Sequence, residues 1–384
     1  MIDDKSPSII KVSSIPYPNH GGNPQAVSKV SGVDPDKLID FSASINPLAP
    51  PGCISQLLLE TPHLLREYPD PHCSAITHNI SQSTGIPKDW IWVTNGSTEM
   101  IYLLPHLLKE EQEVAIFDPC FTEYDKAFSA FGFKSKSITL SPDKLFNADP
   151  SLLFPCLNSI KHLGAVVIGH PASPTGKLYG DFLPHLQNYC EERDVLLIID
   201  EAFIDFSSVN NSAWNLLNTN SNLILIRSLT KFYSIPGLRI GYGVLHPDKI
   251  KQVSSYQYPW SVNALAQAVG AEVIIDSDFK EKTRYWTICE RNFIFKALNS
   301  IPEIEVFPST TNFLLFRIRD NNSLVDQSLY QYLISQFLLI RNCGNFRGLD
   351  HSFFRISFRE HSENQKLVNT IQKFFSSRQQ GFNK

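Results

Sequence analysis

Short apolar runs alternate with longer stretches of helical periodicity between about residues 85 and 245. Each run is continuously apolar and is bounded by turn-forming residues, as expected for strands that are buried on both faces. Between two of them, Phe182–Arg193 repeats apolar residues at helical spacing. The alternation predicts an α/β fold with a mostly parallel sheet between helix layers. The predicted strands are Trp90–Thr94, Val114–Asp118, Ala165–Gly169, Val195–Asp200 and Leu223–Arg227.

Toward the C-terminus the pattern changes and predicts a smaller α+β unit. A long helical region over about 262–298 comes first, and two more helices are expected near 324–337 and from about 361. The strand candidates in this part are Asn312–Arg317, Leu338–Asn342 and Phe353–Phe358.

The chain has 384 residues, enough for two lobes with a substantial core. Residues 1–50 are rich in Pro, Gly, Asn and Ser, which is typical of an extended arm and not of an independent domain. We therefore predict an N-terminal arm over 1–50, a large domain over 51–265 and a small C-terminal domain over 266–384.

The charge and the cysteine pattern exclude several classes of function. A net charge of −4 argues against a general nucleic-acid or membrane-surface binder. The seven cysteines are scattered without a C-x-x-C pair, so neither a disulfide framework nor a metal site is expected. No apolar run approaches the ~18 residues of a membrane span, and Met1–Ser8 lacks the apolar stretch of a signal peptide. We expect a soluble cytoplasmic protein.

The segment Ser228–Tyr242 carries the most specific chemical signal. Lys231 lies three residues after Ser228 and eight before Arg239, in a turn rich in Gly and Pro. This combination suits a lysine amine that bonds to a cofactor aldehyde while its neighbours hold a phosphate. Arg239 offers a fixed fork of donors and Ser228 a hydroxyl. Taken alone, the segment is also compatible with an ordinary exposed turn.

A second candidate turn, Asn95-Gly96-Ser97-Thr98-Glu99, follows the first predicted strand and leads into a helix. The amides and hydroxyls at a helix N-terminus bind an anion such as phosphate. The alternative is simple N-capping by Ser97 or Thr98. Pro105 occupies an interior position of this helix, so we expect a kink or an early end there.

Further candidates follow other strands, because ligands gather at the carboxyl ends of parallel strands. Asp200 ends an apolar strand, and a buried carboxylate needs a cationic partner such as a protonated pyridine nitrogen. Glu201 should point the other way. Ser173 lies in a proline-rich loop, and Phe121 lies at a strand-to-helix turn where it could stack on a flat ring. Each of three candidates has an ordinary alternative. Asp200 is also compatible with a cap of the following loop, Ser173 with a simple turn and Phe121 with an aromatic residue of the core.

In this order and at these separations, the motifs resemble those of the fold-type I pyridoxal-phosphate enzymes of the aminotransferase class, over essentially the whole chain. The resemblance implies that Lys231 binds pyridoxal 5′-phosphate covalently, that Asp200 pairs with the pyridine nitrogen and that Phe121 stacks on the ring. It also implies a homodimer in which Tyr68 reaches the cofactor phosphate of the neighbouring subunit. The residues implied to hold the cofactor phosphate within one subunit are Gly96, Ser97, Thr98, Ser228 and Arg239.

Within that class, the chain is most similar to the threonine-phosphate decarboxylases of cobalamin biosynthesis and next to the histidinol-phosphate aminotransferases. The segments that favour the first are His20-Gly21-Gly22-Asn23, Asp40–Leu48, Asp200–Phe206, Pro259–Ala264 and Ile340–Arg355.

This similarity implies that the N-terminal arm closes over the substrate. Arg355 is then expected on the substrate carboxylate and Arg341 on its phosphate, because bidentate guanidinium groups suit both anions. The other substrate-binding residues that it implies are His20, Gly21, Ser44 and Ser173.

The chain departs from the family pattern at two positions. Ser173 stands where an Asn usually bonds to the cofactor ring oxygen, and Ser44 stands where an Asn is expected near the substrate. Phe203 stands where many histidinol-phosphate aminotransferases have Tyr, which agrees with the decarboxylase pattern.

The resemblance implies decarboxylation of a small phosphorylated amino acid, threonine phosphate or serine phosphate, to an amino-alcohol phosphate for the cobalamin nucleotide loop. The alternatives are an aminotransferase of the histidinol-phosphate type and a non-catalytic binding protein with the same fold.

Overall fold

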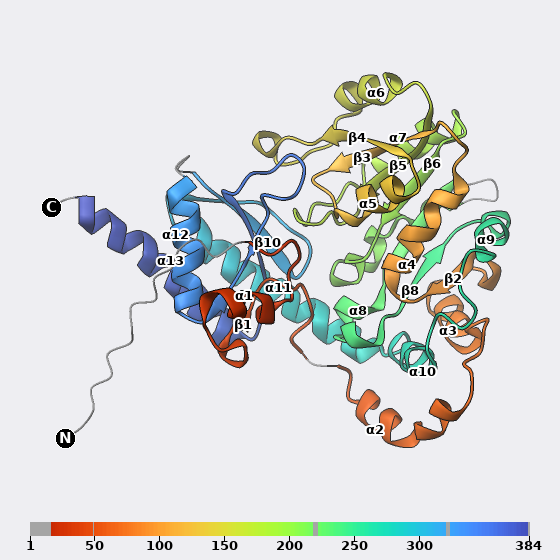
Figure 1. The fold of residues 1–384 in the computed structure, drawn as a ribbon, viewed down its shortest axis with the longest axis horizontal. Helices are drawn as coiled ribbons and strands as arrows, with labels where there is room; N and C mark the ends of the chain where they lie inside the picture. The colour runs from red at the N-terminus through yellow and green to blue at the C-terminus, as the bar shows by residue number, and fades with distance from the viewer. Residues whose placement is uncertain (1–16, 49, 218–221, 320–322, 383–384) are drawn as a thin grey trace.

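The computed structural model describes residues 17–48, 50–217, 222–319 and 323–382, and Figure 1 shows that they form two lobes. We call the part built on a seven-stranded sheet the larger lobe and the part built on a four-stranded sheet the smaller lobe. The first eight residues, where no signal peptide was expected, lie outside the described residues. Within the described ranges, no helix combines the length and apolar character that a bilayer span requires.

The sheet of the larger lobe has the order β2-β8-β7-β6-β5-β3-β4. Its strands pair in parallel except at β8, which runs antiparallel to both β2 and β7. All five strands predicted for this region are present, so the mostly parallel sheet is confirmed. The strands are β2 (Ile91–Thr94), β3 (Glu113–Asp118), β4 (Lys134–Thr139), β5 (Leu163–Gly169), β6 (Leu196–Asp200), β7 (Leu223–Ser228) and β8 (Gly241–Val244).

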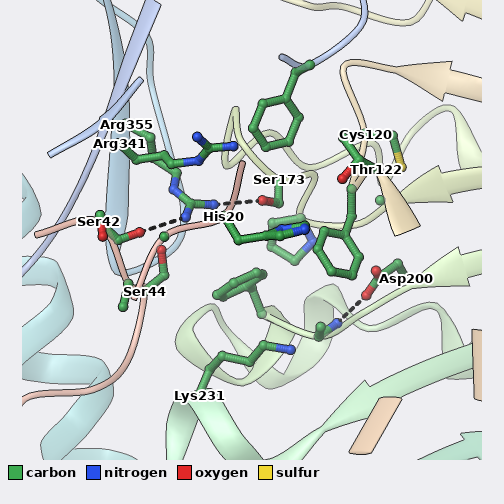
Figure 2. A pocket seen from close by; sticks show the side chains of 18 of the residues that line it. His20, Ser42, Ser44, Cys120, Thr122, Ser173, Asp200, Lys231, Arg341 and Arg355 are labelled. Carbon is green, nitrogen blue, oxygen red and sulfur yellow. Dashed lines mark hydrogen bonds between the residues drawn. The ribbon is translucent and has the colours of Figure 1, made fainter. Parts of the chain in front are cut away.

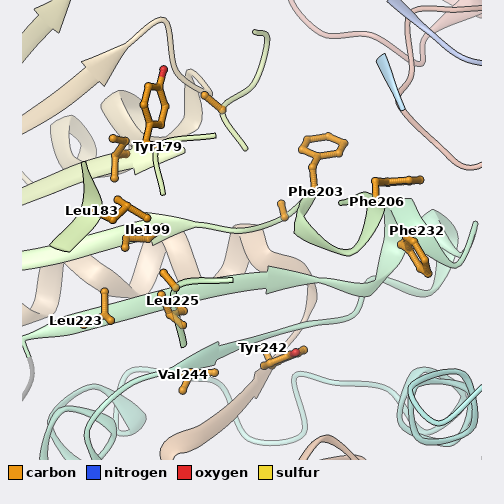
Figure 3. Close-up of a cluster of buried hydrophobic side chains, with 14 of the residues drawn as sticks. Tyr179, Leu183, Ile199, Phe203, Phe206, Leu223, Leu225, Phe232, Tyr242 and Val244 are labelled. Carbon is orange, nitrogen blue, oxygen red and sulfur yellow. The ribbon is translucent and has the colours of Figure 1, made fainter. Parts of the chain in front are cut away.

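Helices cover both faces of this sheet. Successive residues of each central strand point to opposite faces, and because they are apolar, both faces must be buried. On β7, Leu223 and Leu225 belong to one buried cluster, part of which is drawn in Figure 3, whereas Ile224 and Ile226 belong to another. The first cluster includes residues of α3 (Ser74–Thr84), α6 (Pro150–Asn158), α7 (Leu183–Glu191) and α10 (Ala264–Val273). The second includes residues of α4 (Gly96–Leu103), α5 (Glu123–Ala130) and α9 (Pro247–Ser254).

Pro105 ends a helix early, as one of the two expected outcomes. Helix α4 stops at Leu103, and a short 3₁₀ turn over Leu104–Leu107 contains the proline. Because proline has no N–H to donate, it occupies the start of this new turn and not the interior of α4.

The smaller lobe has an antiparallel sheet of order β12-β13-β10-β9. Its strands are β9 (Ile304–Val306), β10 (Phe313–Ile318), β12 (Arg341–Asn342) and β13 (Phe353–Ser357), and its helices are α11 (Ser277–Asn299), α12 (Ser323–Ser335) and α13 (His361–Phe382). The helical region predicted over about 262–298 is two helices, α10 and α11. In Figure 1, α11 extends from this lobe toward the larger one, where it packs against a turn at Ile204–Phe206.

The described part of the N-terminal arm is docked on the smaller lobe. Strand β1 (Ile39–Asp40) pairs in parallel with β11 (Leu338–Leu339), and helix α1 (Pro24–Ser31) precedes it. Val27 and Phe41 are buried in the hydrophobic cluster of the smaller lobe. The single strand predicted over Leu338–Asn342 is therefore divided into β11 and β12, which belong to different sheets.

The domain division predicted at residues 265 and 266 stays a prediction. It falls inside α10, whose Ala266, Val269 and Val273 are buried in a core cluster of the larger lobe. One more helix, α2 (Cys53–Glu60), lies at the edge of the larger lobe in Figure 1.

A buried histidine in the loop after β5 makes stability depend on pH. The His170 side chain accepts a hydrogen bond from the Tyr179 N–H at Nδ1 (3.0 Å) and lies 2.7 Å from the Asn211 carbonyl oxygen at Nε2. Nδ1 is therefore unprotonated and Nε2 is the donor. Burial lowers the pKa of His170.

The neutral form of His170 stabilises the fold, so stability is expected to fall as the pH drops below the unfolded-state value of about 6.5. Urea unfolding at several pH values checks this. His170→Gln should cost about 1–3 kcal/mol at pH 7.5 and should reduce the loss on acidification. An equal loss in wild type and variant would contradict the assignment.

Candidate active site

A cavity of about 290 Å³ lies at the carboxyl ends of β5 and β6, between the two lobes and the N-terminal arm (Figure 2). Many of the predicted site residues line it, although they are spread from the beginning of the described chain to β13. Those that line it are His20, Gly21, Ser44, Ser97, Phe121, Ser173, Asp200, Lys231, Arg341 and Arg355.

Lys231 lies on α8 (Leu229–Phe232), the single helical turn that follows β7. Its Nζ donates a hydrogen bond to Ser228 Oγ at 3.1 Å. The turn is also held by Asn46 of the N-terminal arm. The Asn46 N–H donates to the Lys231 carbonyl oxygen at 2.9 Å, and Asn46 Nδ2 donates to the Phe232 carbonyl oxygen at 2.8 Å. Asn46 therefore fixes the backbone that carries the lysine, and Ser228 contacts its amine.

The electrostatic surroundings favour a neutral lysine amine. Burial lowers the pKa of Lys231 to about 8, and the cations Arg239 and Arg355 act in the same direction, whereas Asp200 opposes them. A pKa in this range lets the amine both lose and accept a proton near neutral pH.

Asp200 and Glu201 point to different surroundings, as the alternation along a strand requires. Asp200 Oδ1 accepts the Ala202 N–H at 2.8 Å at the cavity wall, and burial raises the pKa of this carboxyl while Lys231 opposes the shift. Glu201 instead forms a buried ion pair with Arg227 at 2.8 Å. The predicted divergence of the two carboxylates is confirmed.

The turn at the start of α4 is in close contact with Arg239. Gly96 has φ +73°, and a Cβ built on it would lie 2.6 Å from Arg239 Nη2. A Cβ on Gly241 would lie 2.7 Å from the Ser97 backbone nitrogen. Two glycines thus let an arginine and the N-terminal amides of α4 approach each other. Of the predicted phosphate-binding residues, Ser97 lines the cavity, whereas Gly96, Thr98, Ser228 and Arg239 do not.

Arg355 is buried, and its orientation is set by two neighbours, as Figure 2 shows. Its Nη1 donates to Ser173 Oγ and its Nη2 donates to the Ser42 carbonyl oxygen, both at 3.0 Å. Its Nε has no hydrogen-bond partner among the described residues. Burial lowers the pKa of this guanidinium to about 10. Ser44 lies close by and forms a hydrogen bond of 2.8 Å with Ser357.

Arg341 holds the N-terminal arm in place. Its Nη2 donates to the Asn19 carbonyl oxygen and to Asn345 Oδ1, both at 2.6 Å, and its Nη1 donates to the Pro18 carbonyl oxygen. The arm therefore reaches the cavity with a defined course.

The arm then packs closely on the segment after β1. Gly21 lies so near the Ser42 carbonyl oxygen that no Cβ would fit, and the Gly22 N–H donates to Ser42 Oγ at 2.9 Å. This contact brings His20 to the cavity wall.

Tyr68 is a predicted site residue that lies on the surface. Its side chain is 79% exposed, does not line the cavity and stacks on Trp260 with ring centroids 4.5 Å apart. Its predicted contact is with the cofactor phosphate of a neighbouring subunit and stays a prediction.

The prediction missed several lining residues. Some directly follow predicted strand ends or adjoin predicted site residues, so position alone could have suggested them. Phe346 carries no such signal, and its ring lies 5.5 Å from the Arg341 guanidinium carbon. The lining residues that were not predicted are Ser42, Ala43, Ile45, Cys120, Thr122, Gly169, Pro171, Ala202, Phe203 and Phe346.

Comparison with known proteins points to one family. The model of the family "Aminotransferase class I and II" matches residues 36–371. The chain is 34% identical to the threonine-phosphate decarboxylase of Salmonella typhimurium, over 91% of this chain and 94% of that protein.

Two solved structures extend the comparison. A histidinol-phosphate aminotransferase from Clostridium acetobutylicum has a TM-score of 0.82 at 29% identity and covers 88% of this chain and 100% of its own. An L-threonine-O-3-phosphate decarboxylase from Porphyromonas gingivalis has a TM-score of 0.76 at 25% identity and covers 88% and 99%.

The residues present fit pyridoxal 5′-phosphate, the cofactor of this family. A flat aldehyde with a ring nitrogen and a phosphate needs a reactive amine, a carboxylate and an anion site. Lys231 and Asp200 line one cavity together with Ser97 at the N-terminus of α4, and the Arg239 guanidinium lies against the adjoining Gly96. These are the three groups that the cofactor requires.

The lowered pKa of Lys231 predicts fast modification of its amine in protein freed of cofactor. The pH dependence of labelling by acetic anhydride, read by peptide mass spectrometry, should have a midpoint near 8. Asp200→Asn should lower the midpoint, because the carboxylate favours the protonated amine. A midpoint near the ordinary lysine value of about 10.4 would contradict this description.

Proposed function

The chain belongs to the aminotransferase class I and II family, and we propose that it decarboxylates an amino-acid O-phosphate. The substrate of this proposal is L-threonine O-3-phosphate or serine phosphate, and the product is an amino-alcohol phosphate for the cobalamin nucleotide loop. The enzyme would then be a carbon–carbon lyase that depends on pyridoxal 5′-phosphate.

The observation that carries the proposal is the pairing of two buried arginines at one cavity. Arg341 and Arg355 are directly opposite each other on the antiparallel strands β12 and β13, so their side chains leave the same face of the sheet. Both line the cavity. A short substrate with a carboxylate at one end and a phosphate at the other needs two such cations. The decarboxylase of Salmonella typhimurium, at 34% identity, supports the same assignment.

Bound pyridoxal 5′-phosphate supplies an aldehyde that bonds to amines and a ring that accepts the electron pair of a breaking bond. Lys231 is the residue that we propose to hold it covalently, with Asp200 at the ring nitrogen and Phe121 on the ring face. The residues proposed to hold its phosphate are Gly96, Ser97, Thr98, Ser228 and Arg239. Ser173, whose hydroxyl accepts a hydrogen bond from Arg355, would contribute little to holding its ring oxygen.

The protein's own groups would select which substrate bond breaks. Arg355, held by Ser173 and the Ser42 carbonyl, would bind the carboxylate and fix its direction relative to the cofactor ring. If Arg355 directs the carboxylate, and not the α-hydrogen, out of the plane of the cofactor ring, loss of carbon dioxide would be favoured. The Lys231 amine, with its pKa of about 8, would then deliver a proton to the α-carbon. His20 and Gly21 on the arm would keep water away.

A homodimer is part of the proposal. Leu59, Leu65 and Tyr68 are 81%, 72% and 79% exposed on one stretch of chain, which is unusual for large apolar side chains and supports contact with a second copy. Tyr68 would reach the cofactor phosphate of that copy. The proposed location is the cytoplasm.

The second candidate is transamination of histidinol phosphate, which the similarity to the Clostridium acetobutylicum structure favours. It would use the same Lys231 and the same two arginines, but the bond that breaks would be the one between the substrate α-carbon and its hydrogen. The position of the substrate carboxylate therefore distinguishes the two reactions.

Assays of the purified holoenzyme separate these candidates. O-phospho-L-threonine or O-phospho-L-serine should release carbon dioxide, and Arg355→Gln should lower kcat/KM by about 10²–10³-fold, because it removes a buried partner of the carboxylate. Formation of glutamate from 2-oxoglutarate and histidinol phosphate, without carbon dioxide from the first two compounds, would overturn the proposal.

A serine-to-alanine substitution tests how Ser173 acts. Ser173→Ala should raise KM for the substrate about three- to tenfold, because Arg355 loses one of its two anchors, and it should leave the cofactor dissociation constant unchanged. A weaker cofactor affinity with an unchanged KM would instead assign Ser173 to the cofactor.

A further inference from the structure

The hydrogen bonds of Arg341 leave it only partly available for a phosphate. Three of its five N–H groups are directed to the carbonyl oxygens of Pro18 and Asn19 and to Asn345 Oδ1. A phosphate monoester carries a charge of about −1.5 to −2 near neutral pH. One arginine with its fork already used in part does not neutralise this charge, so other cations are needed at the same end of the cavity.

The next cation lies beside the N-terminal arm. Lys126 Nζ, on α5, is 3.4 Å from Nε2 of His20, which lines the cavity. Both nitrogens lie near one carboxylate oxygen, because Glu123 Oε1 is 2.6 Å from Lys126 Nζ and 3.4 Å from His20 Nε2. The second oxygen of Glu123 accepts the Tyr102 hydroxyl at 3.0 Å. Glu123 is thus fixed. It holds Lys126 and His20, which can both donate hydrogen bonds to a phosphate, next to each other.

The space beside Lys126 borders the active-site cavity. Lys126 lines a second cavity of about 280 Å³ that shares Cys120, Phe121 and Thr122 with the first. Its side chain is about half exposed, so its ammonium group is free to move by a rotamer change.

The charges around His20 are consistent with an anion at this position. Burial and the cations Lys126 and Arg341 lower the pKa of His20, and Glu123 opposes them. A bound phosphate would act in the same direction as Glu123 and favour the protonated ring, which donates from both nitrogens.

We propose that Lys126 is a further substrate-binding residue, which binds the phosphate end of the substrate together with His20 and Arg341 and is positioned by Glu123. The inference rests on the proposed function only in that the substrate is a phosphate ester. It assigns to α5 a role in distinguishing phosphorylated from unphosphorylated amino acids.

The chain offers a matched control for this lysine. Lys136 also pairs with a glutamate, Glu113, and its side chain is 53% exposed, against 52% for Lys126. Lys136 lies on the edge strand β4 and lines neither cavity. A loss that came only from removing a surface ion pair would therefore appear equally in both variants.

The test combines steady-state kinetics with calorimetry on the holoenzyme. Lys126→Met should raise KM for O-phospho-L-threonine about tenfold with kcat within about twofold, whereas Lys126→Arg and Lys136→Met should resemble the wild type. The dissociation constant of isopropyl phosphate, which has neither amine nor carboxylate, should rise by a similar factor in Lys126→Met. Binding of unphosphorylated L-threonine should not change.

Equal effects of Lys126→Met and Lys136→Met, or an equal loss of L-threonine and isopropyl phosphate binding, would overturn the inference, as would a wild-type enzyme that does not bind isopropyl phosphate at millimolar concentration. The calorimetry needs no turnover. Absence of carbon dioxide release together with a Lys126-dependent binding of isopropyl phosphate would therefore reject the decarboxylation and leave this inference standing.

Discussion

The active site depends on keeping the Lys231 amine buried among other cations. A buried ammonium loses its hydration, and Arg239 and Arg355 add repulsion, so the neutral form of the amine becomes accessible near neutral pH. Asp200 limits the effect by attracting the proton. The rest of the architecture positions these groups. Parallel strands place Lys231 and Asp200 at one edge of the sheet, and the smaller lobe places Arg355 at the same cavity.

The paired arginines show how backbone register places two cations at one cavity. Arg341 and Arg355 are fourteen residues apart in sequence, yet they are direct cross-strand neighbours. A shift of one residue in this pairing would turn one side chain to the opposite face. The register is supported on one side by β10, which pairs with every residue of β13. On the other side, β12 directly follows β11, and β11 pairs with the N-terminal arm. In the proposed function, recognition of two anionic groups would thus rest on main-chain hydrogen bonds between strands.

Much of the larger lobe could be predicted from the sequence, because buried parallel strands are continuous apolar runs that end in polar residues. Lys231, Asp200 and Ser97 were identified in this way. Strand β8 was missed, because Gly241 and Gly243 read as turn residues, although Gly241 is required where the backbone of Arg227 and Ser97 approaches too closely for a Cβ. Edge strand β4 was missed, because its exposed lysines hide the alternation. Phe346 could not be found, because tertiary packing alone brings the loop after β12 to the cavity.

Asn46 joins three separate parts of the molecule. Besides its bonds to the Lys231 and Phe232 carbonyls, its amide donates to Thr283 Oγ1 on α11, the helix that extends from the smaller lobe. A rotation of the smaller lobe that displaced this part of α11 would act through one side chain on the backbone that carries Lys231. Domain closure and reorientation of the lysine would then be one mechanical event, with Asn46 as the link between them.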